Sequence, residues 1–194
     1  MFDIIYEATR QINTQIFFLS ALLFFIGYVF APTAYYKNIR WLIAYPMFVV
    51  RIMDQFLKVS HHPLKIFIIV MSLNTVSLFL NLLSGWGVIL PYLFIIYMGI
   101  NIGVVMYHTL EGEFYYLELV NPVAMIELPA AWLSISMAIQ FNLTSFWGNT
   151  SLPQIEFSRY FTYFLVLVIP MLFLAGVLET ILIKFGEKNK IGRN

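Results

Sequence analysis

Five stretches of about 20 apolar residues decide what this sequence can fold into. They cover approximately residues 16–36, 64–83, 86–110, 119–141 and 160–183. An α-helix of this length crosses the hydrocarbon core of a bilayer and satisfies its own backbone hydrogen bonds. Only 11% of the residues are charged, against about 25% in soluble domains. We therefore predict an all-α protein, a polytopic bundle of transmembrane helices that forms a single integral membrane domain over residues 1–194.

A sixth segment, residues 39–57, is shorter in its apolar part. The run IRWLIAYPMFVV has about 12 residues and would be about 18 Å long as a helix. It contains Pro46 and is followed by Arg51 and Asp54. This length and these charges favour an interfacial or re-entrant helix over a full span.

Basic residues are distributed unevenly between the two sides of a bundle with five spans. Arg10 and Arg159 lie on one side, and the other nine lie on the opposite side: Lys37, Arg40, Arg51, Lys58, Lys65, Lys184, Lys188, Lys190 and Arg193. Because Lys and Arg are enriched in cytoplasmic loops, we expect the N-terminus outside and the C-terminus in the cytoplasm of a cell membrane. The first apolar run follows acidic residues and has no small-residue cleavage pattern, so we expect a retained span.

The fourth apolar stretch, NPVAMIELPAAWLS, contains a carboxylate beside a helix breaker. An acid at the centre of a membrane helix costs about 2.5–3.5 kcal/mol on insertion scales, so Glu127 needs a partner, a proton or water. Pro129 removes a backbone donor and crowds the carbonyl of Met125, which predicts a local break. A freed carbonyl beside an acid suits a cation or a proton. The alternative is that Glu127 accepts hydrogen bonds from neighbouring helices and fixes their packing.

Three further polar residues are candidates for the same polar path. Glu179 falls in the same half of the membrane as Glu127, and two carboxylates there predict a shared proton or a bound cation. The alternative for Glu179 is an interfacial pair with Lys184. Asn101 lies in the third span, and His108 lies nearer the cytoplasm, where a proton relay could begin, although an interfacial role suits a His at a span end equally. The pattern indicates no particular metal.

Small and polar residues indicate how the helices pack. Gly99 and Gly103 form a G-x-x-x-G pattern, which lets a neighbouring helix approach closely. Pro122, Pro129 and Pro170 are the predicted helix breaks or packing positions. In the second span a polar stripe, formed by Asn74, Ser77 and Asn81, predicts a face turned into the bundle.

Other classes of function have little support in the sequence. No nucleophile elbow, zinc-protease or phosphate-loop motif is present, so we expect no enzymatic activity. The chain has no cysteine and a net charge of +1, which argues against thiolate metal sites and against nucleic acid as a partner. We expect no cofactor. The expected partners are the lipid bilayer, a second copy of the chain in a dimer, and other membrane proteins.

Three segments of the sequence resemble successive blocks of one membrane protein family. They are GWGVILPYLFIIYMGINIGVV, NPVAMIELPAAWLSISMA and LVLVIPMLFLAGVLETIL. Over approximately residues 79–183 they resemble the stage II sporulation protein M family, most specifically in the ELPA core that begins at Glu127. Pro122 matches the start of that block, but Val123 and Ala124 stand where the family usually has His and Gly. The resemblance implies a small, non-enzymatic polytopic protein, as a dimer, and its sporulation member looks like a component that recruits cell-wall-degrading partners.

Two functions follow from these observations. The first is an ion or small-solute channel or transporter, in which Glu127, Glu179 and Asn101 line a polar path. The second is a membrane scaffold that recruits envelope-remodelling or other membrane partners, with the glutamates serving helix packing and the connection from Lys37 to Lys65 docking partners or anionic lipid. The surroundings of Glu127 distinguish them.

Overall fold

The structure, a computed structural model, describes residues 2–59, 62–148 and 153–191, which form helices joined by short connections, with no strand among them. The α-helices are α1 (Phe2–Gln11), α2 (Thr14–Tyr36), α3 (Arg40–Val59), α4 (Pro63–Leu83), α5 (Leu90–Thr109), α6 (Ala124–Asn142), α7 (Pro153–Tyr163) and α8 (Ile169–Ile191). Short 3-10 segments occur at η1 (Ser84–Trp86) and η2 (Tyr115–Val120), and π-helical turns occur at η3 (Leu143–Trp147) and η4 (Phe164–Val168). The all-α class is thus confirmed.

Within the described residues, five helical segments are long and apolar enough to cross a membrane, which confirms the predicted number. They are Thr14–Tyr36, Pro63–Trp86, Leu90–Thr109, Ala124–Trp147 and Pro153–Phe185. The start of the fourth span was predicted wrongly at residue 119. Residues Tyr115–Val120 form the separate segment η2, and Pro122 stands in the turn that follows, so the α-helix begins only at Ala124.

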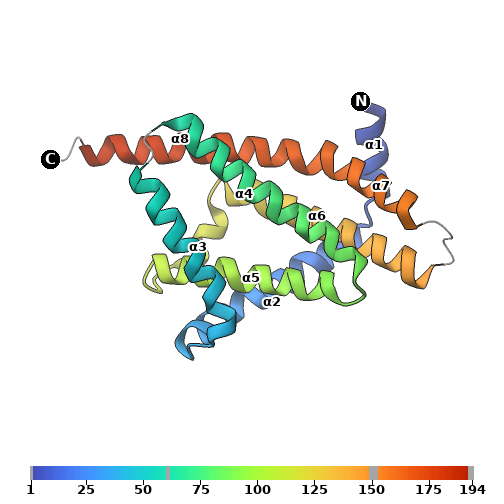
Figure 1. The fold of residues 1–194 in the computed structure, drawn as a ribbon, viewed down its shortest axis with the longest axis horizontal. Helices are drawn as coiled ribbons and strands as arrows, with labels where there is room; N and C mark the ends of the chain where they lie inside the picture. Colours follow the sequence, from blue (N-terminus) through green and yellow to red (C-terminus); the bar gives the residue numbers. More distant parts are fainter. Residues whose placement is uncertain (1, 60–61, 149–152, 192–194) are drawn as a thin grey trace.

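The long helices run side by side along the long axis of the molecule, and α6 lies at their centre (Figure 1). Helix α6 contacts α2, α4, α5 and α8, and it is the span with the largest buried share. Helix α1 and the C-terminal end of α8 lie at opposite ends of the bundle (Figure 1). This arrangement is the one that an odd number of spans requires.

Helices α2 and α5 make the closest contact in the bundle. A Cβ atom added to Gly99 would lie 2.1 Å from the carbonyl oxygen of Phe24, and one added to Gly27 would lie 2.0 Å from that of Ile96. Gly103 faces the same helix, with Ala31 Cβ 2.5 Å from its added Cβ. The G-x-x-x-G pattern therefore lies in the interface and lets the two backbones touch.

Helix α3 is longer than its apolar run and continues past Pro46, which is buried. It is not among the five candidate spans, and Figure 1 shows it running across the direction of α2 and α5. Its Leu42 is buried in a cluster with Ala34 on α2 and Val104 on α5. An interfacial position for this helix stays a prediction.

The three prolines differ in their effect on the helices. Pro122 lies between η2 and α6, where the chain turns. The predicted breaks at Pro129 and Pro170 are wrong, because α6 and the α7–η4–α8 segment run through them. Pro129 comes early in α6, near the exposed Met125 whose carbonyl it leaves without the usual donor. Pro170 follows a widened turn in which the Ile169 N–H donates to the carbonyl oxygen of Phe164, and this turn accommodates the ring.

Asn142 clamps the turn that joins α4 to α5. Its side chain is fully buried, and its Nδ2 donates to the carbonyl oxygens of Gly85 at 3.1 Å and Gly87 at 2.9 Å. We expect Asn142→Ala to lower the free energy of unfolding by about 2 kcal/mol, because one buried and one partly buried carbonyl oxygen lose their donor. Thermal unfolding in detergent checks this, with the exposed Gln15→Ala as control. Equal melting temperatures for the two variants would contradict it.

Candidate functional site

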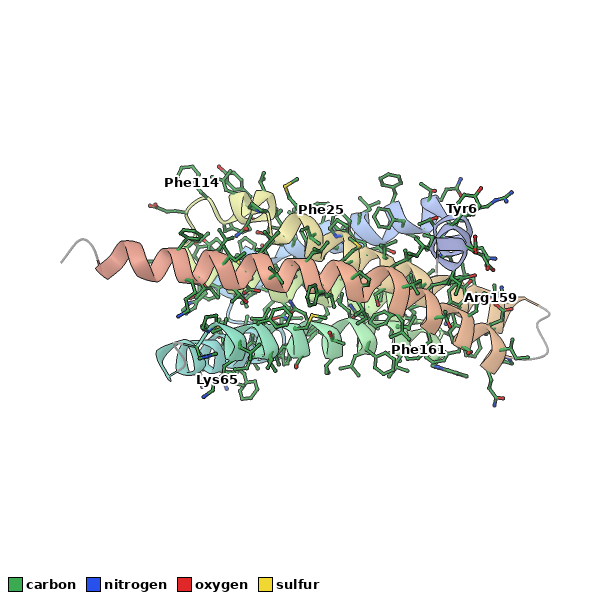
Figure 2. All side chains as sticks on the ribbon, turned by 90° about the horizontal axis from the view of Figure 1, so that it is seen from above. Tyr6, Phe25, Lys65, Phe114, Arg159 and Phe161 are labelled. Atoms are coloured by element: carbon green, nitrogen blue, oxygen red, sulfur yellow. The ribbon has the colours of Figure 1, made fainter. Side chains whose placement is uncertain are left out.

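A partly open pocket of about 390 Å³ lies where α5, α6 and α8 meet, toward the C-terminal end of the bundle. Its lining includes two carboxylates and one amide-bearing residue among apolar side chains, namely Glu127, Glu179, Asn121, Met106, Leu182 and Ile183. Figure 2 shows Lys65 and Phe114 at this end of the molecule and Arg159 and Tyr6 at the other. The pocket therefore lies toward the end of the bundle where most of the basic residues are found.

Glu127 is held by the start of α6 and by α4. It lies in the first turn of α6, is half-buried, and its Oε1 accepts a hydrogen bond of 2.5 Å from Nδ2 of Asn74. The preceding turn is fixed by Asn121, whose Oδ1 accepts from the backbone N–H of Val123 at 3.0 Å. A carboxylate in the first turn of a helix interacts favourably with the positive end of the helix dipole. Glu127 is thus positioned by two helices, and one of its carboxylate oxygens already accepts a hydrogen bond.

Glu179 reaches the same pocket from α8. It is half-buried, and it lines the pocket together with Glu127 although the two residues are 52 positions apart in the sequence (179 minus 127). Within the described part of the chain, no ion pair to a basic side chain is seen for either carboxylate, and a pair between Glu179 and Lys184 stays a prediction. Two carboxylates in one pocket repel when both are charged, and a proton or a cation between them relieves the repulsion.

The structure does not bring the other two predicted path residues to this pocket. Asn101 is half-buried on α5, and its Oδ1 is buried without a hydrogen-bond partner in the described residues. Nδ1 of His108 lies 2.9 Å from the hydroxyl of Tyr35, so His108 links the end of α5 to α2. The four polar residues therefore separate into a carboxylate pocket and two side chains elsewhere on α5.

The polar stripe on α4 was predicted in part correctly. Asn74 faces the bundle and bonds Glu127, and the buried Asn81 donates from Nδ2 to Sδ of Met98 at 3.3 Å. Ser77 is exposed, because it lies to one side of the contact with α6. The stripe was the signal that could have identified Asn74 as the partner of Glu127.

Asn121 was missed by the sequence reasoning. Its role comes from the turn between η2 and α6, and the sequence pattern placed that turn inside a continuous span.

The donor groups at the pocket are too few for a closed metal site. Among the residues whose placement is described, no three His, Cys, Asp or Glu side chains come together in a way that could hold a metal ion. The arrangement suits a proton or a cation that keeps part of its hydration or that offers its own hydrogen-bond donors.

Comparison with known proteins extends the resemblance seen in the sequence. The family model described as stage II sporulation protein M matches residues 14–182, from the start of the first span to Leu182 in the pocket lining on α8. No curated protein and no solved structure matches the chain. Because the family match covers most of the chain and all the helices that build the pocket, this protein belongs to the stage II sporulation protein M family.

Proposed function

We propose that this multi-pass membrane protein is a non-enzymatic transporter of a small cation or of protons, with Glu127 and Glu179 as its binding site. The observation that carries the proposal is the meeting of two carboxylates, from α6 and α8, in one pocket of a membrane bundle. Ionisable groups inside membrane segments usually mark ion or proton pathways, because they are expensive to keep there without a function.

The size of the pocket supports a hydrated or organic cation. Its volume of about 390 Å³ is far larger than the share of one water molecule in the liquid, which is about 30 Å³. The carboxylates offer negative charge, and the apolar side chains around them lower the local dielectric and strengthen the attraction.

The pocket lies toward the C-terminal end of the bundle. Beyond the pocket, the residues of α6 from Ser134 to Asn142 are all buried. Transport therefore requires that α6 or α8 moves, as in transporters that open their site to each side in turn. By the distribution of basic residues, the open end faces the cytoplasm.

Purified protein in proteoliposomes tests the proposal. We expect a pH gradient or a gradient of Na⁺ or K⁺ to dissipate faster in vesicles with the protein than in empty vesicles. Flux at the level of empty vesicles for protons and for every cation tried, including small organic amines, would overturn it.

A second candidate function is a membrane scaffold, and the packing of α6 favours it. The buried stretch Ser134–Asn142 carries internal hydrogen bonds, such as that from Ser134 Oγ to the carbonyl oxygen of Leu78 at 2.6 Å, which is typical of a rigid bundle. In this role the partners are a second copy of the chain or other envelope proteins. The scaffold predicts that loss of the Glu127 charge changes stability or partner capture while no solute moves.

A further inference from the structure

Helix α3 presents three different faces around its axis. The inner face carries Leu42 and Pro46, which are buried, and Met47, which packs against the α2–α5 pair. Among the side chains described on α3, which end at Ile52, the exposed ones include two groups of different chemistry.

The first exposed part is an aromatic stripe formed by Trp41, Tyr45 and Phe48. These residues are separated by four and three positions, so they lie on one line along a helix with 3.6 residues per turn. Their exposed fractions are 75%, 50% and 57%. Three large apolar rings in one row are not expected to face bulk water.

The second exposed part is a basic line on the adjacent side of the helix. Arg40 and Arg51 are both exposed, and their separation of eleven residues corresponds to about three turns, so they point the same way. Lys37 and Lys65, just before α3 and just after the start of α4, are exposed as well. Between residues 37 and 65 the sequence has five basic residues and one acidic residue, Asp54.

An aromatic stripe beside a basic line limits the environments in which α3 can lie. The hydrocarbon core would accept the aromatic stripe but not two exposed arginines, and water would accept the arginines but not the stripe. The interface layer accepts both, with aromatic rings at the acyl boundary and guanidinium groups among the phosphates. Figure 1 shows that α3 runs across the long helices, which is the direction of a helix lying in that layer.

We infer that α3 is a lipid-binding surface helix whose basic line holds the headgroups of anionic phospholipids while its aromatic stripe enters the acyl boundary. The lipid phosphate is the ligand class, because guanidinium groups form charge-assisted hydrogen bonds with phosphate oxygens. The surface is separate from the carboxylate pocket, which α5, α6 and α8 line, so the inference does not depend on the proposed transport.

Cysteine labelling tests the placement of the stripe, and the chain has no cysteine of its own. Trp41→Cys and Phe48→Cys report on the stripe, and the exposed Ala44→Cys and Arg51→Cys report on the basic side. In nanodiscs of phosphatidylcholine and phosphatidylglycerol, we expect a membrane-impermeant maleimide to label the stripe positions several-fold more slowly. Equal labelling of the two pairs would overturn the inference.

Lipid preference tests the basic line. Spin-labelled phosphatidylglycerol is expected to be enriched over spin-labelled phosphatidylcholine around the wild-type protein. In Arg40→Gln/Arg51→Gln we expect this preference to fall by about five-fold or more, since one basic side chain near an anionic surface contributes about that factor. Arg10→Gln, an exposed arginine at the other end, is the matched control. Slow labelling of the stripe with an unchanged lipid preference would assign the stripe to a protein neighbour or to neutral lipid, and would overturn the headgroup site.

Discussion

The Gly99→Ala variant is expected to lose the packed pair of α2 and α5 and to unfold far more easily than the wild type. The added Cβ would lie 2.1 Å from the carbonyl oxygen of Phe24 and 2.9 Å from the backbone nitrogen of Tyr28. Both are backbone atoms of a neighbouring helix, so neither can rotate away as a side chain would. Separating the helices would open the contact at Gly27 as well. We expect a loss of about 3 kcal/mol or more, at the upper end for overpacked cores.

Thermal unfolding in detergent measures this loss, and Gly176→Ala is the matched control. There the added Cβ meets only the ring edge of Phe67, at 3.2 Å, and the ring can shift. Alanine is also favoured over glycine inside a helix by about 1 kcal/mol, so this variant is expected to melt at or slightly above the wild-type temperature. If Gly99→Ala behaves in the same way, the close approach of α2 and α5 does not exist.

The Glu127→Gln variant is expected to reduce cation or proton flux to the level of empty vesicles while the fold is kept. Glutamine has nearly the same size as glutamate, and its Oε1 still accepts the hydrogen bond from Asn74. The change removes the negative charge of Glu127 and leaves Glu179 in the pocket. A transporter that needs this charge loses its binding site and its flux, whereas a scaffold that uses Glu127 for packing shows a changed stability or partner capture and moves no solute with or without the substitution.

Two further variants make this result specific. Glu179→Gln, on the other side of the pocket, is expected to reduce flux as well. Glu113→Gln, an exposed acid in the connection between α5 and α6, is expected to leave flux unchanged. The melting temperature of each variant is recorded together with its flux. Wild-type flux in Glu127→Gln, or a flux loss that appears only together with unfolding, would remove the carboxylate from the mechanism.

Isolated polar residues in apolar stretches of the sequence predicted part of the candidate site. Glu127 and Glu179 were placed in the same half of the membrane by counting residues along their helices, and the structure places both on one pocket. Asn101 was grouped with them on the same reasoning but lies elsewhere on α5. Depth along the membrane follows from the sequence, whereas the direction in which a side chain points around its helix depends on the neighbours.

The prolines show a second limit of local reasoning. Pro122 coincides with a turn, but Pro129 and Pro170 lie inside continuous helical segments. A proline inside a helix costs a few kcal/mol of helix stability. The packing of neighbouring helices, or one widened turn, can offset this cost. A proline in a membrane sequence therefore marks a weak point in the hydrogen-bond ladder, and the surrounding helices determine whether the helix ends there.

The sequence by itself determined that this is an all-α membrane protein with five candidate spans and a member of its family, because helix length and apolarity are properties of each segment alone. Only the tertiary structure decided that α5, α6 and α8 enclose one pocket, that Asn74 engages Glu127, and that α3 exposes an aromatic stripe beside a basic line. These features depend on the rotation of each helix about its axis. Helix rotation is set by contacts between segments distant in the chain, and hydropathy contains no information about it.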